Sequence, residues 1–137
     1  MTGFPVVVPF VDHLGARLLS CAEGASHVEL DLAPHHCNSF SVAHGGVLMT
    51  LLDVTMAMAG RSRTHHVDDE QMGLVTIEMK TTFMQPAQGA RIASHGRCVY
   101  RSRTMAFCEA DIVDEGGRTV ARASGTFKYV RQRQTAS

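Results

Sequence analysis

The sequence has no net charge, because 13 Lys and Arg balance 13 Asp and Glu across 137 residues. Without an overall field, nothing favours nucleic acid, an anionic membrane or a polyacidic partner, so any bound anion must be held locally. Long apolar runs are also lacking, since none approaches the roughly 20 residues that cross a bilayer. The apolar N-terminal patch is interrupted by Pro5 and Pro9 and has no basic segment, unlike a secretory signal. The sequence therefore predicts a soluble cytoplasmic protein with no nucleic-acid or membrane partner.

Cysteine is scarce and irregularly spaced. The four cysteines, at positions 21, 37, 98 and 108, form no Cys-x-x-Cys pair and no zinc-finger spacing, so we expect reduced structural thiols. Two segments resemble metal ligands by composition, His35-His36-Cys37 and residues 65–70. Neither has a recognised ligand spacing. We expect both to be solvated loops and predict no metal site.

The distribution of apolar residues predicts one domain over residues 1–137, with a core from about residue 10 to 130 and flexible ends. Alternating apolar residues predict two short strands between Ala16 and Leu32, and four more after about residue 72. Between them, residues 45–59 are apolar on nearly every side, which is typical of a buried helix. Strands flanking a single helix predict an α+β fold with a mostly antiparallel sheet wrapped around that helix.

The predicted helix carries one acid, Asp53, among apolar neighbours, and begins at Gly45-Gly46. A carboxylate in such a setting requires a partner or a function. At a helix start the first N–H groups have no acceptor inside the helix, so Gly45 and its neighbour offer donors to an oxyanion. Asp53 lies eight residues further on, about 12 Å along the axis. One chain cannot easily join the two, whereas a two-fold dimer with antiparallel helices brings Asp53 of one subunit to Gly45 of the other.

The combination of Asn38, His44-Gly45-Gly46, Asp53 and the strand Leu74–Ala87 resembles the PaaI-type branch of the hotdog-fold acyl-CoA thioesterases, in the 4-hydroxybenzoyl-CoA thioesterase superfamily. The resemblance spans roughly residues 10 to 130. It implies a hotdog fold, hydrolysis of an acyl- or aryl-CoA thioester to the free acid and CoA, and a homodimer that pairs into a homotetramer. It implies no cofactor, since coenzyme A is part of the substrate.

The resemblance also implies a role for each matching residue. The Gly45 backbone N–H donates to the thioester carbonyl, and Asp53 acts across the dimer as general base or as nucleophile. Asn38 holds the carbonyl or the attacking water, Thr76 orients that water beside the acid, and His44 lines the site near the sulfur. One departure is visible at Ser41, where family members often have glycine.

The CoA phosphates require a local basic group. Arg101, Ser102 and Arg103 fall in a predicted turn where the family commonly has a basic residue near the nucleotide.

Other interpretations stay open from the residues alone. Asp53 is also compatible with a structural carboxylate, Gly45 with close packing, Asn38 with a turn, and His44 and Thr76 with ordinary structural positions. The same fold hosts hydratases and dehydratases, and a non-catalytic acyl-CoA binding protein would share the pattern. The sequence decides neither the acyl preference nor the chemical role of Asp53.

Overall fold

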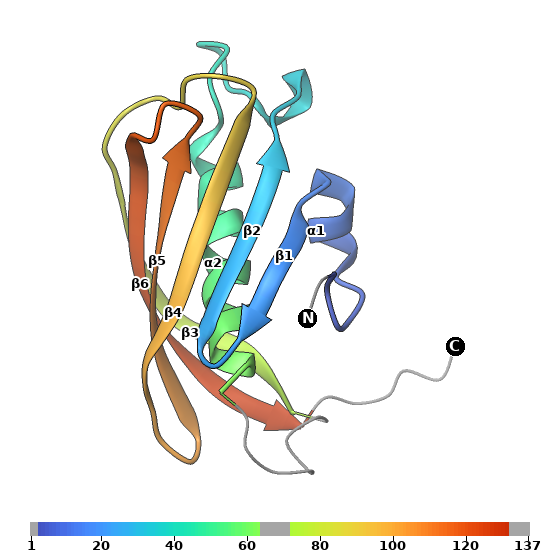
Figure 1. The fold of residues 1–137 in the computed structure, drawn as a ribbon, viewed down its shortest axis with the longest axis vertical. Coiled ribbons are helices and arrows are strands. Elements are labelled where there is room, and N and C mark those ends of the chain that lie inside the picture. The colour runs from blue at the N-terminus through green and yellow to red at the C-terminus, as the bar shows by residue number, and fades with distance from the viewer. Residues whose placement is uncertain (1–2, 64–71, 132–137) are drawn as a thin grey trace.

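Six strands form one antiparallel sheet around a single long helix (Figure 1). The computed structural model describes residues 3–63 and 72–131. The strand order is β1-β2-β4-β5-β6-β3, and every neighbouring pair is antiparallel. The strands are β1 (Arg17–Ala22), β2 (Ala25–Asp31), β3 (Met72–Phe83), β4 (Arg91–Arg101), β5 (Met105–Asp114) and β6 (Thr119–Arg131). This is the predicted hotdog fold.

Helix α2 (Gly45–Arg61) packs against one face of the sheet and supplies much of the core. Its apolar side chains, including Leu51, Leu52 and Met56, are almost fully buried. Helix α2 comes close to the sheet at Gly96 in β4, where an added Cβ would lie 2.8 Å from the Thr55 carbonyl oxygen. Only glycine fits there, and the fit fixes α2 over the centre of the sheet.

Strand β3 forms one edge of the sheet and is largely exposed. Val75, Ile77 and Phe83 leave about half of their surface open. A long, apolar, unpaired edge is a template for pairing with another strand.

The N-terminal segment before β1 forms a short helix and contacts the rest of the domain. Helix α1 (Pro9–Leu14) was not predicted, although proline at its first turn and glycine directly after it are ordinary helix start and stop residues. Gly15 adopts φ 85° at its C-terminus. Before the helix, the Gly3 N–H donates to the Leu18 carbonyl at 2.9 Å, and Phe4 packs against the core.

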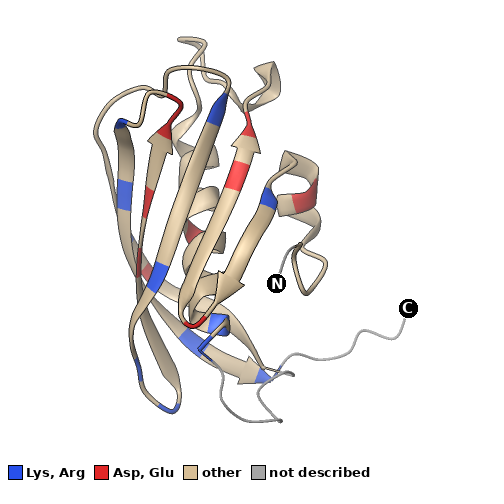
Figure 2. Cartoon of the chain, viewed as in Figure 1, with Lys and Arg blue, Asp and Glu red and all other residues tan. Residues whose placement is uncertain are grey.

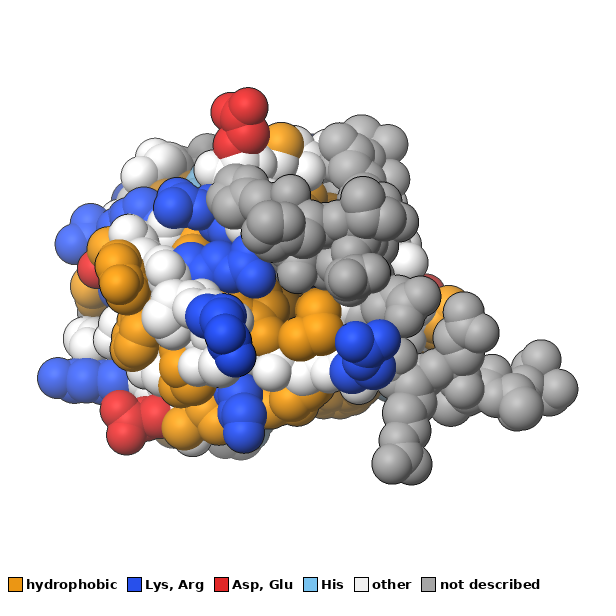
Figure 3. Space-filling model, turned by 90° about the horizontal axis from the view of Figure 1, so that it is seen from below, with side chains coloured by type: hydrophobic (Ala, Val, Ile, Leu, Met, Phe, Trp, Pro, Cys, Tyr) orange, Lys and Arg blue, Asp and Glu red, His pale blue; other side chains and the backbone are white. Residues whose placement is uncertain are grey.

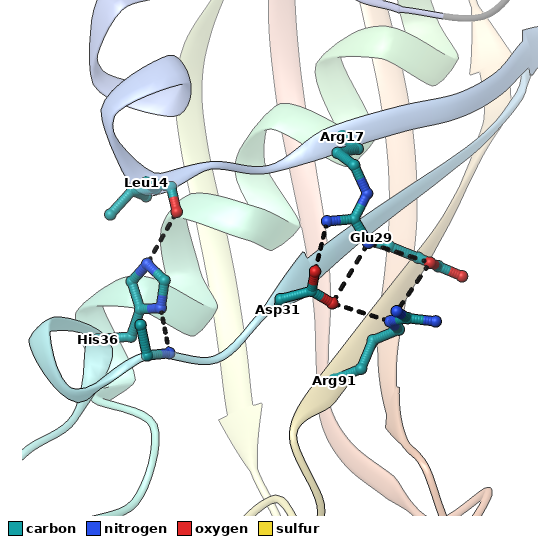
Figure 4. Close-up of polar contacts among 7 residues, drawn as sticks. Leu14, Arg17, Glu29, Asp31, His36 and Arg91 are labelled. Atoms are coloured by element: carbon teal, nitrogen blue, oxygen red, sulfur yellow. Dashed lines mark hydrogen bonds and ion pairs between the residues drawn. The ribbon is translucent and has the colours of Figure 1, made fainter.

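His36 is buried in the structure, so the solvated-loop prediction was wrong for this residue. It belongs to the short 3-10 helix η1 (Pro34–His36). One ring nitrogen lies 2.8 Å from the Leu14 carbonyl oxygen, and Nδ1 accepts the Ala33 N–H at 2.9 Å (Figure 4). The imidazole therefore fastens the loop before α2 to the end of α1.

The described part of the chain holds no cluster of three or more His, Cys, Asp or Glu placed to bind a metal ion. The second candidate metal segment, residues 65–70, lies outside the described residues. None of the helices within residues 3–63 and 72–131 is long and apolar enough to cross a membrane.

Candidate active site

Asp53 and Thr76 meet between the middle of α2 and strand β3. The Thr76 hydroxyl donates a 2.6 Å hydrogen bond to Asp53 Oδ1, and the carboxylate is only partly buried. The acid in the apolar helix therefore has a partner. The second carboxylate oxygen, Oδ2, receives no hydrogen bond from the described residues, so it is available to a water or a substrate.

A cavity of about 400 Å³ lies beside this pair. Its walls come from the N-terminal segment, α2, β3 and the end of β6, and most of them are apolar. The lining residues include Val6, Val8, Val54, Ala57, Leu74 and Val130. The contribution of the N-terminal segment was not predicted, because its contacts with α2 are far apart in sequence. An apolar cavity bordered by one polar pair is the usual form of a small-molecule site.

The start of α2 presents one free backbone donor. His44 is the N-cap residue, and its Nδ1 accepts the Gly46 N–H at 2.8 Å. The expectation that both glycine N–H groups point outward unpaired is therefore wrong for Gly46. The Gly45 N–H finds no acceptor within the described residues, and it lies in the positive field of the helix start. The imidazole keeps Nε2 for another contact.

Asn38 shapes the loop that leads to this donor. Its Oδ1 accepts the Phe40 N–H at 2.9 Å and the Val42 N–H at 3.4 Å, so the side-chain oxygen closes a turn. The amide nitrogen Nδ2 remains as a donor. Ser41 has φ 60° in this turn, a left-handed conformation that favours glycine. The glycine that the family resemblance leads us to expect here would suit this backbone conformation, which the chain meets with serine.

The two halves of the predicted site do not meet within one chain. Gly45 and Asp53 lie about 12 Å apart along α2. Phe83, at the end of β3, borders the glycine instead: an added Cβ at Gly45 would lie 3.5 Å from its ring. Sequence reasoning missed Phe83, since nothing in an alternating strand marks one aromatic residue as a neighbour of a helix start.

Of the three predicted CoA-binding residues, two already have structural contacts. Arg101 ends β4 rather than lying in the turn, its guanidinium lies 4.2 Å from the centre of the Tyr129 ring, and it donates to the Arg63 carbonyl. The Ser102 hydroxyl accepts the Met105 N–H at 3.0 Å. Arg103 is exposed at the tip of the β4–β5 hairpin.

These residues belong to a basic end of the molecule, where α2, β4 and β6 finish (Figure 2). Its members are Arg61, Arg63, Arg101, Arg103, Lys128 and Arg131. Seen from below, Lys and Arg side chains surround apolar side chains over this end (Figure 3). A neutral protein thus has a local concentration of positive charge that suits an anion.

Comparison with known proteins identifies the family to which the chain belongs. The thioesterase superfamily model matches residues 40–121. Human acyl-coenzyme A thioesterase 13 is 27% identical over 111 residues, which cover 80% of this chain and 76% of the human protein.

Two solved structures share the fold. A conserved protein from Pseudomonas aeruginosa superposes with a TM-score of 0.83 and 27% identity, covering 90% of this chain and 95% of that one. The PaaI protein of the E. coli phenylacetic acid degradation operon has a TM-score of 0.79 and 19% identity, covering 91% and 86%. The family match spans more than half of the sequence, and the chain therefore belongs to the thioesterase superfamily.

Proposed function

We propose that the chain is an acyl-CoA thioesterase, which hydrolyses an acyl- or aryl-CoA thioester to the free acid and CoA. The observation that carries this proposal is the Asp53–Thr76 pair in the wall of an apolar cavity. A carboxylate held by a hydroxyl, with one oxygen open to solvent, is suited to activating water beside a bound apolar group.

In the proposed reaction the Gly45 N–H donates to the thioester carbonyl oxygen and stabilises the negative charge that develops there. Asp53 removes a proton from water as the water oxygen attacks the carbonyl carbon. The carbon–sulfur bond then breaks, and the CoA thiolate is protonated as it leaves. In the alternative route, Asp53 attacks the carbonyl itself and water hydrolyses the resulting anhydride.

Three further residues assist in this proposal. Thr76 fixes the carboxylate of Asp53 through its 2.6 Å hydrogen bond. Asn38 Nδ2 donates to the carbonyl or to the attacking water, while its oxygen keeps the loop closed. His44 Nε2 faces the sulfur, because Nδ1 is held by the helix backbone.

A homodimer completes each site. The exposed apolar edge of β3 supports pairing with β3 of a second copy, which would extend the sheet and cover Val75 and Ile77. Antiparallel pairing centred near the middle of β3 would place Asp53 beside the partner's Gly45. Val99 and Phe107 are exposed on the outer face of the sheet and support a second interface, in a homotetramer.

The basic end is the proposed site for the CoA phosphates. Of the three predicted residues, Arg103 is the one available to a phosphate, because it is exposed and Arg101 and Ser102 already have other contacts. A flexible cation at a hairpin tip can bind a phosphate without disturbing the core.

Thiol release from a panel of aryl- and alkyl-CoA thioesters tests the proposal. We expect hydrolysis of at least one substrate and a loss of several orders of magnitude in turnover in Asp53→Asn. Asp111→Asn, on the outer face of the sheet, is a matched control that should retain full activity. Near-normal turnover in Asp53→Asn would contradict the mechanism. Tight binding of acyl-CoA without hydrolysis by the unaltered protein would instead favour a binding protein.

A further inference from the structure

Two cysteines face each other across strands β4 and β5. Cys98 and Cys108 are register partners in this antiparallel pair, and both are free thiols. They are 6% and 2% exposed, on the sheet face that packs against α2. Opposite residues of an antiparallel pair point to the same face of the sheet, so the two thiol side chains are direct neighbours.

The backbone hydrogen bonds define what kind of pair this is. The Cys98 N–H donates to the Gly24 carbonyl at 2.7 Å, on the side of β2, and therefore points away from β5. Cys98 and Cys108 are thus a non-hydrogen-bonded pair, in which the Cα atoms lie about 4.5 Å apart. That separation falls within the range found in disulfides, at its short end.

The two thiols differ in acidity. The neighbouring Cys108 thiol lowers the pKa of Cys98, despite the opposing effect of burial, and the charges of Arg63 and Arg101 act in the same direction. The same interaction, together with burial, raises the pKa of Cys108. The pair therefore combines a thiol that forms the nucleophilic thiolate with a neighbour that stays protonated.

We propose that Cys98 and Cys108 form a reversible disulfide when the protein meets a peroxide. The Cys98 thiolate attacks one peroxide oxygen and becomes a sulfenic acid, and the other oxygen leaves as water after protonation. The Cys108 sulfur then attacks the sulfenic sulfur, the sulfur–oxygen bond breaks, and a second water leaves. Two thiols and one hydrogen peroxide give one disulfide and two waters.

The local backbone makes this bond possible and easy to reduce. Opposite Cβ atoms lie about 4.5–5.5 Å apart in such pairs, whereas disulfides place them about 3.5–4.5 Å apart. Because the Cα atoms are already at the short end of the disulfide range, the two Cβ atoms must tilt toward each other, which strains the bond. A register shift between Cys98 and Tyr100 interrupts the regular ladder at this point, which eases that adjustment. Strained disulfides are the ones that thiols reduce readily.

The other two cysteines serve as internal comparisons. Cys21 is buried, donates to the Met58 carbonyl at 3.2 Å, and has its pKa raised by that burial. Cys37 is the most exposed of the four but has no thiol opposite it in the described structure. Exposure alone predicts oxidation at Cys37, whereas the geometry predicts it at the cross-strand pair.

Peptide mapping of the folded full-length chain after hydrogen peroxide treatment and alkylation tests the proposal. We expect a peptide pair linked through Cys98 and Cys108 that disappears with dithiothreitol, and no other linked pair. The matched variant Cys37→Ser should keep this bond. In Cys108→Ser, Cys98 should instead react with dimedone, a reagent for sulfenic acids.

Oxidation confined to Cys37, or linked peptides that contain Cys37 in place of the cross-strand pair, would overturn the proposal. The proposal is also overturned if all four thiols still react with the alkylating reagent after treatment with peroxide at levels that oxidise a control thiol. If Cys108→Ser does not fold, mapping of the unaltered chain and of Cys37→Ser decides the question alone.

Discussion

The hydroxyl of Thr76 provides a sharp test of the proposed site, because it can be removed without changing the shape of the side chain. Thr76→Val replaces the hydroxyl by a methyl group and deletes the 2.6 Å hydrogen bond to Asp53. A hydrogen bond to a charged group contributes about 1.5–3 kcal/mol, and about 1.4 kcal/mol corresponds to a factor of ten in rate. Since the pair is partly open to solvent, water replaces some of the loss. We therefore expect kcat/KM to fall about ten-fold.

The assay is continuous thiol release from the best acyl-CoA substrate, with kcat and KM measured separately. Thr76→Ser keeps the hydroxyl and should retain most of the activity, which separates loss of the hydrogen bond from disturbance of β3. Thermal unfolding should show both variants folded. Equal kcat/KM in Thr76→Val and the unaltered protein would refute the role given to this contact.

Contacts at Gly96, Asp114 and Arg103 can be tested in the same way. An added Cβ at Gly96 would lie 2.8 Å from the Thr55 carbonyl oxygen of α2, so Gly96→Ala should lower the free energy of unfolding by about 1–3 kcal/mol. An unchanged midpoint of urea unfolding would argue against the close approach of α2. The Gln88 N–H and the Arg118 guanidinium lower the pKa of Asp114. Its charge therefore stabilises the fold above the unfolded pKa of about 3.9, and this is lost as pH falls through the lower folded value. Asp114→Asn should have a lower free energy of unfolding than the unaltered protein at pH 7, and the difference between the two proteins should shrink below about pH 3.9. If urea unfolding gives the same difference at both pH values, this role of Asp114 is contradicted. Finally, Arg103→Ala should raise KM several-fold for CoA thioesters but not for the matching N-acetylcysteamine thioesters, which lack the nucleotide; equal effects on both would exclude a phosphate contact.

Local patterns predicted most of the fold. The alternation in residues 28–32, the hairpin at residues 114–117 and the apolar run of α2 depend on neighbours in sequence, and the structure confirms each within a few residues. Helix α1 was missed because six residues carry too little periodicity, although Pro9 and Gly15 marked its ends. The strand order β1-β2-β4-β5-β6-β3 joins distant segments, and only the family resemblance could supply it.

For the candidate site, the sequence identified key residues but not the contacts that their side chains make. Asp53 was identifiable because an acid in an apolar helix is chemically out of place, and Gly45 because a helix begins there. Which partner each polar side chain selects could not be predicted. The His44 ring accepts the Gly46 N–H two residues on, although the spacing alone does not show which partner the ring selects. Arg101 stacks on Tyr129, which only the folded chain brings close.

In the proposed homodimer, each active site combines Asp53 of one subunit with Gly45 of the other. Gly45→Pro removes the proposed oxyanion donor at a position where proline suits a helix start. The preceding residue, His44, already has the extended conformation that proline requires, with φ −65° and ψ 138°. Asp53→Asn removes the acid.

The decisive measurement is the turnover of a purified heterodimer with one chain of each variant, co-expressed under two affinity tags. Both homodimers should be inactive. In the heterodimer, one site contains both substitutions, and the other combines the intact Asp53 of one chain with the intact Gly45 of its partner. The heterodimer should therefore show about half of the unaltered activity. A folded heterodimer as inactive as the two homodimers would contradict the shared site.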